Sequence, residues 1–177
     1  MLIQYFCSMG RESLVSVPMA HLTQIIRRFL ALCLLIAFAV QLDAEESDWV
    51  TDEKVRAILD RGSPGVFYAW SPHMPLSVNG LHEILTAGER LDLVVIPVLS
   101  SHANIAYARD RIDGLDLPES VLRRGQSTEL IGRDLFVHAP AILVFDGGGF
   151  VSPVLPGFRY AADYEALIGR FLASAGR

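Results

Sequence analysis

Residues 66–75 have the sequence VFYAWSPHMP, in which a run of β-forming side chains changes into a helix start. Residues 66–70 predict a buried strand, because β-branched and aromatic residues pack well on a pleated surface. Ser71 and Pro72 predict an N-cap and a first helical position, since a serine oxygen can accept an orphan amide and proline has no amide to leave unsatisfied. We therefore expect a strand that leads directly into a helix ending near Ala87.

The chain beyond this segment alternates apolar runs with helical patterns. The continuous apolar run at residues 91–99 is typical of a strand covered on both faces. The sequence DGGG at residues 146–149 lies between two β-forming runs and predicts an antiparallel hairpin. Asn79 and Gly80 are weak helix formers and predict a kink in the helix they interrupt. The predicted helices are 49–59, 72–87, 103–112, 118–124, 127–135 and 161–173, and the predicted strands are 66–70, 91–99, 141–145 and 150–155.

Residues 1–44 have the layout of an N-terminal signal peptide. A pair of arginines precedes an unbroken apolar run at residues 29–40, and Ala44 offers a small residue for cleavage. The run is shorter than the roughly 20 residues that a membrane-spanning helix needs, so we expect cleavage after Ala44 and no stable membrane anchor. Translation starts at Met1 or, for a signal peptide of more ordinary length, at Met19. The mature domain is then residues 45–177, in the periplasm or outside the cell.

The positions of the cysteines and the net charge of the chain limit which classes of function are expected. Both cysteines, Cys7 and Cys33, precede the predicted cleavage site, so the mature chain has no thiol although it enters an oxidising compartment. The formal net charge is −5 and the chain has a single lysine, Lys54. Binding a phosphate backbone calls for clustered basic residues, so nucleic acid is not an expected partner.

The order strand, helix, strand, helical region, hairpin, helix predicts an α/β domain with a mixed central β-sheet flanked by helices. It resembles the thioredoxin-like superfamily over roughly residues 50–175. Residues 66–74 are similar to the strand, tryptophan and active-site turn of thioredoxins. Residues 139–148, APAILVFDGG, are similar to the family's cis-proline, apolar strand and glycine turn, which implies a cis bond before Pro140. Residues 157–168 are similar to the family's last glycine and closing helix.

The chain departs from the family at both redox cysteines. The resemblance places their positions at Ser71 and Met74, the ends of Ser71-Pro72-His73-Met74. Disulfide exchange needs one thiolate to attack and a second thiol to resolve, and neither an alcohol nor a thioether supplies these at neutral pH. His73 lies two residues after Ser71 at the expected helix start, where it is badly placed as a general base, and no acidic residue is positioned to orient it. We therefore predict a redox-inactive protein that is not an enzyme.

The family's active-site edge is a shallow groove for extended peptides, and we expect the groove to persist without cysteines. The resemblance then implies a binding or accessory module, without a cofactor, for another exported protein or peptide segment. Simpler structural roles stay open, with Trp70 at the edge of the core, Met74 as a gap-filler and Ser71 as a helix cap. The expected groove residues are Trp70, Ser71, Pro72, His73, Met74, Ala139 and Pro140.

Copper binding is the alternative function. His73, Met74 and His138 could converge if the resemblance holds, because His138 lies two residues before the expected cis-proline. Imidazole and thioether are acceptable ligands for copper(I). Against this, two of the ligands are neighbours in sequence and no thiolate accompanies them, so we favour the binding module without a metal.

Overall fold

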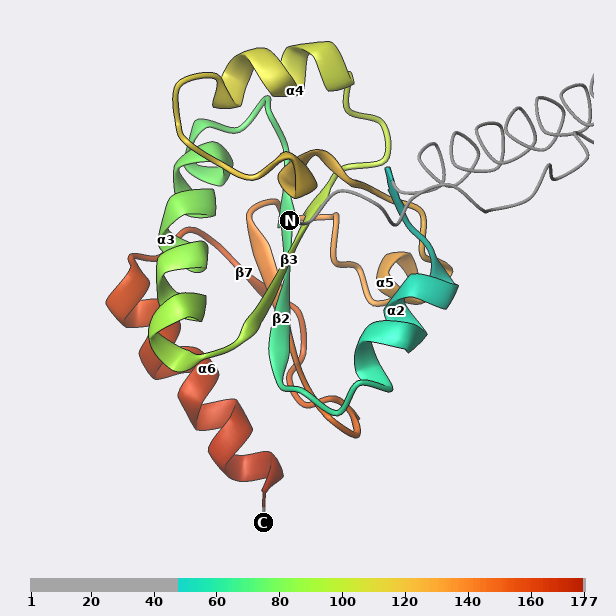
Figure 1. Cartoon of the computed structure of the whole chain (residues 1–177), viewed down its shortest axis with the longest axis vertical. Coiled ribbons are helices and arrows are strands. Elements are labelled where there is room, and N and C mark those ends of the chain that lie inside the picture. Colours follow the sequence, from blue (N-terminus) through green and yellow to red (C-terminus); the bar gives the residue numbers. More distant parts are fainter. Residues whose placement is uncertain (1–47, 177) are drawn as a thin grey trace, which may run out of the picture. The chain divides into compact units, whose positions relative to one another are not determined.

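The computed structural model describes residues 48–176, which form a β-sheet between two groups of helices (Figure 1). The predicted signal peptide and its cleavage site lie outside the described residues. Among residues 48–176, no helix has the length and apolar character that crossing a membrane requires. The strands are β1 (Trp49–Val50), β2 (Gly65–Trp70), β3 (Val94–Leu99), β4 (Arg124–Gly125), β5 (Ala141–Asp146), β6 (Gly149–Phe150) and β7 (Leu155–Pro156). The helices are α2 (Asp52–Leu59), α3 (Pro75–Leu91), α4 (Ile105–Ile112), the 3-10 helix η1 (Glu119–Leu122), α5 (Thr128–Gly132) and α6 (Ala161–Ala175).

The sheet is mixed, as the sequence predicts, and β2 lies at its centre. β2 pairs in parallel with β3 and antiparallel with β5. The strand order is β1-β4-β3-β2-β5-β6, and β7 also pairs with β5. A parallel β2–β3 pair needs a crossover connection, which α3 provides. The chain therefore forms the predicted α/β domain with a mixed central sheet.

Alternate residues of β2 enter two different cores. Tyr68 and Trp70 face the core beneath α3 and α6, whereas Phe67 and Ala69 face the core that includes residues of α2 and α5. Figure 1 shows these two pairs of helices on opposite sides of the sheet. Every residue of β2 is buried, because the strand is covered on both faces. The continuous β-forming run in the sequence reflects this double burial.

The predicted helix start at Pro72 is wrong, and α3 begins three residues later, at Pro75. Met74 is its N-cap, and Pro75 occupies the first helical position, where a missing amide costs no hydrogen bond. Ser71 is therefore not the cap of this helix. α3 continues through Gly80 to Leu91 without a break.

Other element boundaries also differ from the predictions. Trp49 and Val50 form the edge strand β1, and α2 begins only after Thr51, whose hydroxyl accepts a hydrogen bond from the Lys54 amide at 3.4 Å. The predicted strand over residues 91–99 begins at Val94, because α3 ends at Leu91 and Asp92 takes a left-handed conformation there. The predicted helix over 118–124 is the shorter η1 followed by β4, and the helix over 127–135 is the shorter α5.

The returning strand of the predicted hairpin is divided into β6 and β7. Both short strands pair with β5. Between them, the hydroxyl of buried Ser152 accepts a hydrogen bond from the Val144 amide at 2.9 Å. The serine side chain thus replaces a main-chain carbonyl where the strand is interrupted, and the amide of β5 stays satisfied.

Candidate functional site

Residues 71–74 form a turn at the carboxyl end of β2, and a buried serine holds it in place. The Ser71 amide donates a hydrogen bond to the hydroxyl oxygen of Ser77 at 2.9 Å. The Met74 amide donates to the Ser71 carbonyl at 3.2 Å. Ser77 is fully buried on α3. The turn is therefore fixed by main-chain and serine contacts, which require no cysteine.

Two buried tyrosines, Tyr68 on β2 and Tyr164 on α6, lie in the core beneath α3. The Tyr68 hydroxyl donates a hydrogen bond to the Ser77 carbonyl at 2.9 Å. Its ring meets that of Tyr164 edge to face, with centroids 6.4 Å apart. Burial raises the pKa of both Tyr68 and Tyr164, because a phenolate would lose its hydration there. Both phenols stay neutral at physiological pH and serve as structural contacts.

The cis-proline loop lies beside this turn. The bond between Ala139 and Pro140 is cis, which confirms the prediction for Pro140. In the antiparallel register of β2 and β5, Ala69 pairs with Ala141. The two residues before Ala141 therefore run beside the residues that follow Ala69, at the same end of the sheet. Pro140 is buried and Ala139 is half-buried.

Trp70 does not line a surface groove. Its side chain is fully buried, and its Nε1 donates a hydrogen bond to the Val121 carbonyl at 2.7 Å. Pro72 is buried as well. The structure thus gives Trp70 the core position that was the simpler interpretation of the sequence. Trp70 therefore anchors the end of β2 in the core, and the exposed side chains at this end belong to other residues, such as His73 and Met74.

Exposed apolar side chains surround the turn. The exposed fractions are 46% for Met74 and 55% for Leu76, on and just after the turn. On α4, Tyr107 is 39% exposed and stacks on the His73 ring with centroids 4.9 Å apart and planes inclined by 24°. We call His73, Met74, Leu76 and Tyr107 the apolar edge. Leu76 and Tyr107 were not among the groove residues that the sequence analysis expected.

The copper alternative depends on three exposed residues. His73, Met74 and His138 are all exposed, and His73 is in addition stacked on Tyr107. Within the part of the chain that the structure describes, no three histidine, cysteine, aspartate or glutamate side chains gather as a metal-binding group would. The predicted donor set for copper(I) consists of two imidazoles and one thioether, without a thiolate. Copper binding stays a prediction from the sequence.

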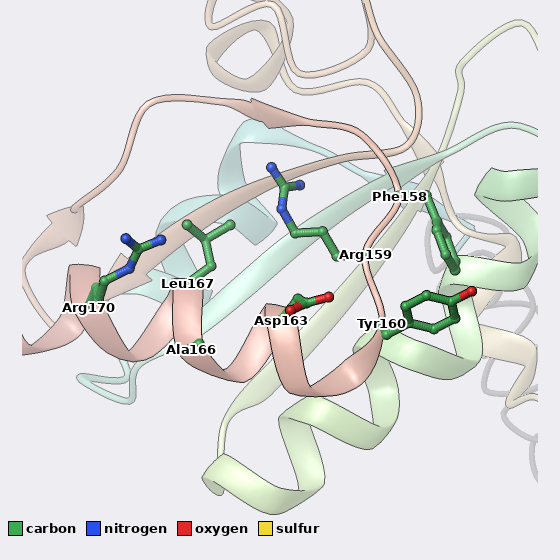
Figure 2. Close-up of a pocket in the computed structure, with 7 residues that line it drawn as sticks. All are labelled: Phe158, Arg159, Tyr160, Asp163, Ala166, Leu167 and Arg170. Carbon is green, nitrogen blue, oxygen red and sulfur yellow. The ribbon is translucent and has the colours of Figure 1, made fainter.

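A second surface feature continues from the cis-proline loop. The Gly157 amide donates a hydrogen bond to the Pro140 carbonyl at 2.7 Å, and residues 158–160 then lead into α6. An open groove of about 540 Å³ lies along this segment and α6 (Figure 2). Its lining residues are Phe158, Arg159, Tyr160, Asp163, Ala166, Leu167 and Arg170.

No protein-family model and no curated protein sequence matches this chain. Among solved structures, the chain is similar to a thiol:disulfide interchange protein of the thioredoxin family from Chlorobium tepidum TLS, with 15% identity, a TM-score of 0.50, and coverage of 66% of this chain and 83% of that chain. A secreted Mycobacterium tuberculosis disulfide oxidoreductase homologous to E. coli DsbE is 18% identical, with a TM-score of 0.46 and coverage of 66% and 85%. The N-terminal domain of PilB from N. meningitidis is 19% identical, with a TM-score of 0.46 and coverage of 62% and 81%.

The similarity to the Chlorobium tepidum protein shows the fold. The chain has a thioredoxin-like fold, which confirms the predicted fold class. The Ser71 turn and the cis-proline loop meet at one end of the sheet, as the resemblance implies. Fold alone does not determine activity, so the function has to be argued from the side chains at this end.

Proposed function

We propose that the mature protein is an exported, redox-inactive binding or accessory module that holds an extended segment of another exported protein at its apolar edge. The observation that carries this proposal is the turn itself. Ser71 and Met74 occupy the positions that the resemblance assigns to the redox cysteines, and residues 48–176 contain no cysteine. Thiol-disulfide exchange has no attacking or resolving group there.

The apolar edge is suited to a peptide segment. Met74 and Leu76 expose flexible aliphatic side chains, and Tyr107 adds an aromatic ring held by its stacking on His73. Burying such side chains contributes roughly 25 cal/mol for each Å² of apolar surface removed from water. Methionine adapts to varied apolar partners, whereas aromatic side chains supply rigid contact area. The edge therefore combines an adaptable contact with a fixed one.

The support beneath the edge favours binding with little reorganisation. Ser77 fixes the turn through the Ser71 amide, and Trp70 is anchored on Val121 from the core side. A preorganised surface loses less conformational entropy on association than a mobile one does. This argues for recognition by an already formed surface.

The location is proposed from the sequence. An arginine pair, the apolar run at residues 29–40 and Ala44 have the layout of a cleaved signal peptide. We therefore propose that the domain works in the periplasm or outside the cell, where its partner is another exported protein.

Selection of displayed peptides on the purified mature domain tests the binding function. A library of random 12-residue peptides should yield binders whose affinity falls at least tenfold when Met74→Asp or Leu76→Asp places a carboxylate in the apolar edge. The matched control is Ile131→Asp on α5, because Ile131 is 49% exposed and lies outside the apolar edge. Failure to select any binder, or equal loss with Ile131→Asp, would argue against the proposal.

Redox assays test the other half of the proposal. The mature domain should reduce insulin no faster than buffer alone between about pH 6 and 9, the range in which reactive thiolates would form. The variant carrying both Ser71→Cys and Met74→Cys should close a disulfide under oxidant, since the family turn holds these two positions close together. Insulin reduction by the unmodified domain would overturn the redox-inactive assignment.

A copper(I) titration against a calibrated chelator separates the alternative function. We expect no stoichiometric binding, because three neutral ligands without a thiolate form a weak site. One copper per chain, lost in both His73→Ala and His138→Ala, would replace the binding module with a copper-binding accessory protein.

A further inference from the structure

The groove along α6 is connected to the cis-proline loop by a short stretch of chain. Gly157 is hydrogen-bonded to the Pro140 carbonyl, and the next three residues line the groove. Phe158 packs beside Gly80 of α3, and its ring meets that of Tyr160 edge to face at 5.2 Å. Tyr160 is 66% exposed. An aromatic pair therefore connects α3 to the groove, with one ring packed and the other open to solvent.

Two guanidinium groups give the groove its positive charge. Arg159 Nη1 donates hydrogen bonds to the carbonyls of Pro156 and Gly157, at 3.1 and 3.0 Å, which orients the group and leaves its other nitrogens for a ligand. Arg170 is exposed one turn from Leu167 on α6. Figure 2 shows both guanidinium groups on the same side of α6, with Leu167 between them. Among residues 48–176, neither arginine has an ion-pair partner.

Among the residues that line the groove, one carboxylate opposes this charge; a second carboxylate, that of Glu83, accepts a hydrogen bond from the Ala161 amide at 2.8 Å at the start of α6. Asp163 is the acidic residue among those that line the groove, and it is exposed in the first turn of α6. The neighbouring Glu165 on the same helix is already paired with Arg90 at 2.9 Å. The groove thus presents two cations to one anion, although the whole chain has a formal net charge of −5.

We propose that this groove binds acidic side chains of the peptide whose apolar part lies on the apolar edge. The inference rests on the proposed function and adds a charge requirement to it: the bound segment combines apolar residues with aspartate or glutamate. Guanidinium groups favour carboxylates because the two can form parallel hydrogen bonds. The orienting bonds to Arg159 reduce the entropy that this pairing costs.

The shape of the groove favours a peptide as the source of these carboxylates. The groove is open along its length and is lined by apolar Ala166 and Leu167 as well as by the two arginines. Residues 157–160 connect the cis-proline loop to the groove, because the Gly157 amide is hydrogen-bonded to the Pro140 carbonyl and the next three residues line the groove. The apolar floor accommodates the aliphatic part of a glutamate, and the arginines take its carboxylate.

The composition of the displayed peptides tests the inference. Binders selected on the mature domain at low salt should be enriched in aspartate and glutamate, and the enrichment should disappear with Arg170→Glu. Arg61→Glu is the matched control, because it changes the net charge equally at an exposed site after α2. For one selected peptide, Arg170→Glu should raise Kd by roughly fivefold, in the range of exposed ion pairs. Asp163→Asn should lower Kd, and both effects should shrink as salt screens the charges.

The outcomes separate the two proposals. Binders without acidic residues, or equal effects of Arg170→Glu and Arg61→Glu, overturn the acidic-peptide inference while the binding function stands. An increase in Kd with Asp163→Asn also overturns it, since removal of a repelling carboxylate must favour an acidic ligand. A library that yields no binder overturns the proposed function and this inference together.

Discussion

Replacing Gly80 with alanine should destabilise the protein, although alanine is the better helix former. Gly80 is buried inside α3, and a Cβ added there would lie 2.1 Å from the Tyr68 hydroxyl oxygen and 3.1 Å from its Cζ. Tyr68 is fully buried and donates a hydrogen bond to the Ser77 carbonyl, so its hydroxyl cannot move aside without losing that bond. The substitution therefore forces a clash in the interior.

The magnitude follows from opposing contributions. Alanine stabilises a helix interior by about 1 kcal/mol relative to glycine. Overpacking a core costs about 1–3 kcal/mol, and loss of the Tyr68 hydrogen bond costs a further 1 kcal/mol or so. The net destabilisation by Gly80→Ala is then about 1–3 kcal/mol, which urea denaturation of the mature domain measures as a lower unfolding midpoint.

A second substitution, Tyr68→Phe, should remove the destabilising effect of Gly80→Ala. In a Tyr68→Phe background the hydroxyl is absent, and the nearest ring atom at 3.1 Å needs only a small shift. Gly80→Ala should then be neutral or stabilise by up to about 1 kcal/mol, giving a coupling energy of about 1–4 kcal/mol in the double-mutant cycle. The control is Gly169→Ala in α6, where an added Cβ meets no atom within 4 Å and should stabilise by up to about 1 kcal/mol. If Gly80→Ala stabilised the unmodified chain as Gly169→Ala does, the reasoning would be refuted.

Two further predictions concern α2 and the turn. Hydrogen bonds from residues at the start of α5, the largest effect coming from Ser127, lower the pKa of Asp52 from 3.8 to about 2. A pKa that is lowered by folding contributes stability above pH 4 and loses it as the pH falls from about 4 towards 2, so Asp52→Asn should flatten this part of the acid-unfolding curve. Ser77→Ala removes the acceptor of the Ser71 amide and should destabilise by about 1 kcal/mol. Amide exchange at Ser71 should rise as well, and unchanged exchange there would contradict the role given to Ser77.

Local sequence patterns were sufficient for the order of the longer elements, whereas the short strands β1 and β4 overlap stretches that were predicted as helix. The run at residues 66–70 predicts a fully buried strand because both of its faces are covered, and β2 has this burial. The cis-proline followed from the resemblance at residues 139–148 and is confirmed at Pro140. The strand is encoded within a few neighbouring residues, whereas the cis bond was implied by the resemblance to the thioredoxin-like superfamily.

The details of the site depend on contacts between distant segments. Pro72 and Pro75 both suit the first turn of a helix, and local rules could not choose between them. Trp70 is buried in the core, where its Nε1 donates a hydrogen bond to the carbonyl of Val121, which is 51 positions away in sequence. The exposure of Tyr107 depends on where α4 packs near the turn, which no local pattern specifies. The prediction therefore located the turn correctly and misjudged which of its side chains reach the surface.

The hydrogen bond from the Ser71 amide to Ser77 has a consequence for how such a surface can evolve. Because a serine inside α3 and the main chain hold the turn, its shape does not depend on a sulfur–sulfur link that opens and closes. The contacts that fix the turn are therefore separate from its exposed side chains. His73 and Met74 can be replaced while the hydrogen bonds between Ser71, Met74 and Ser77 keep the backbone of the turn in place. A ligand held on this turn would experience the same geometry in reducing and in oxidising surroundings.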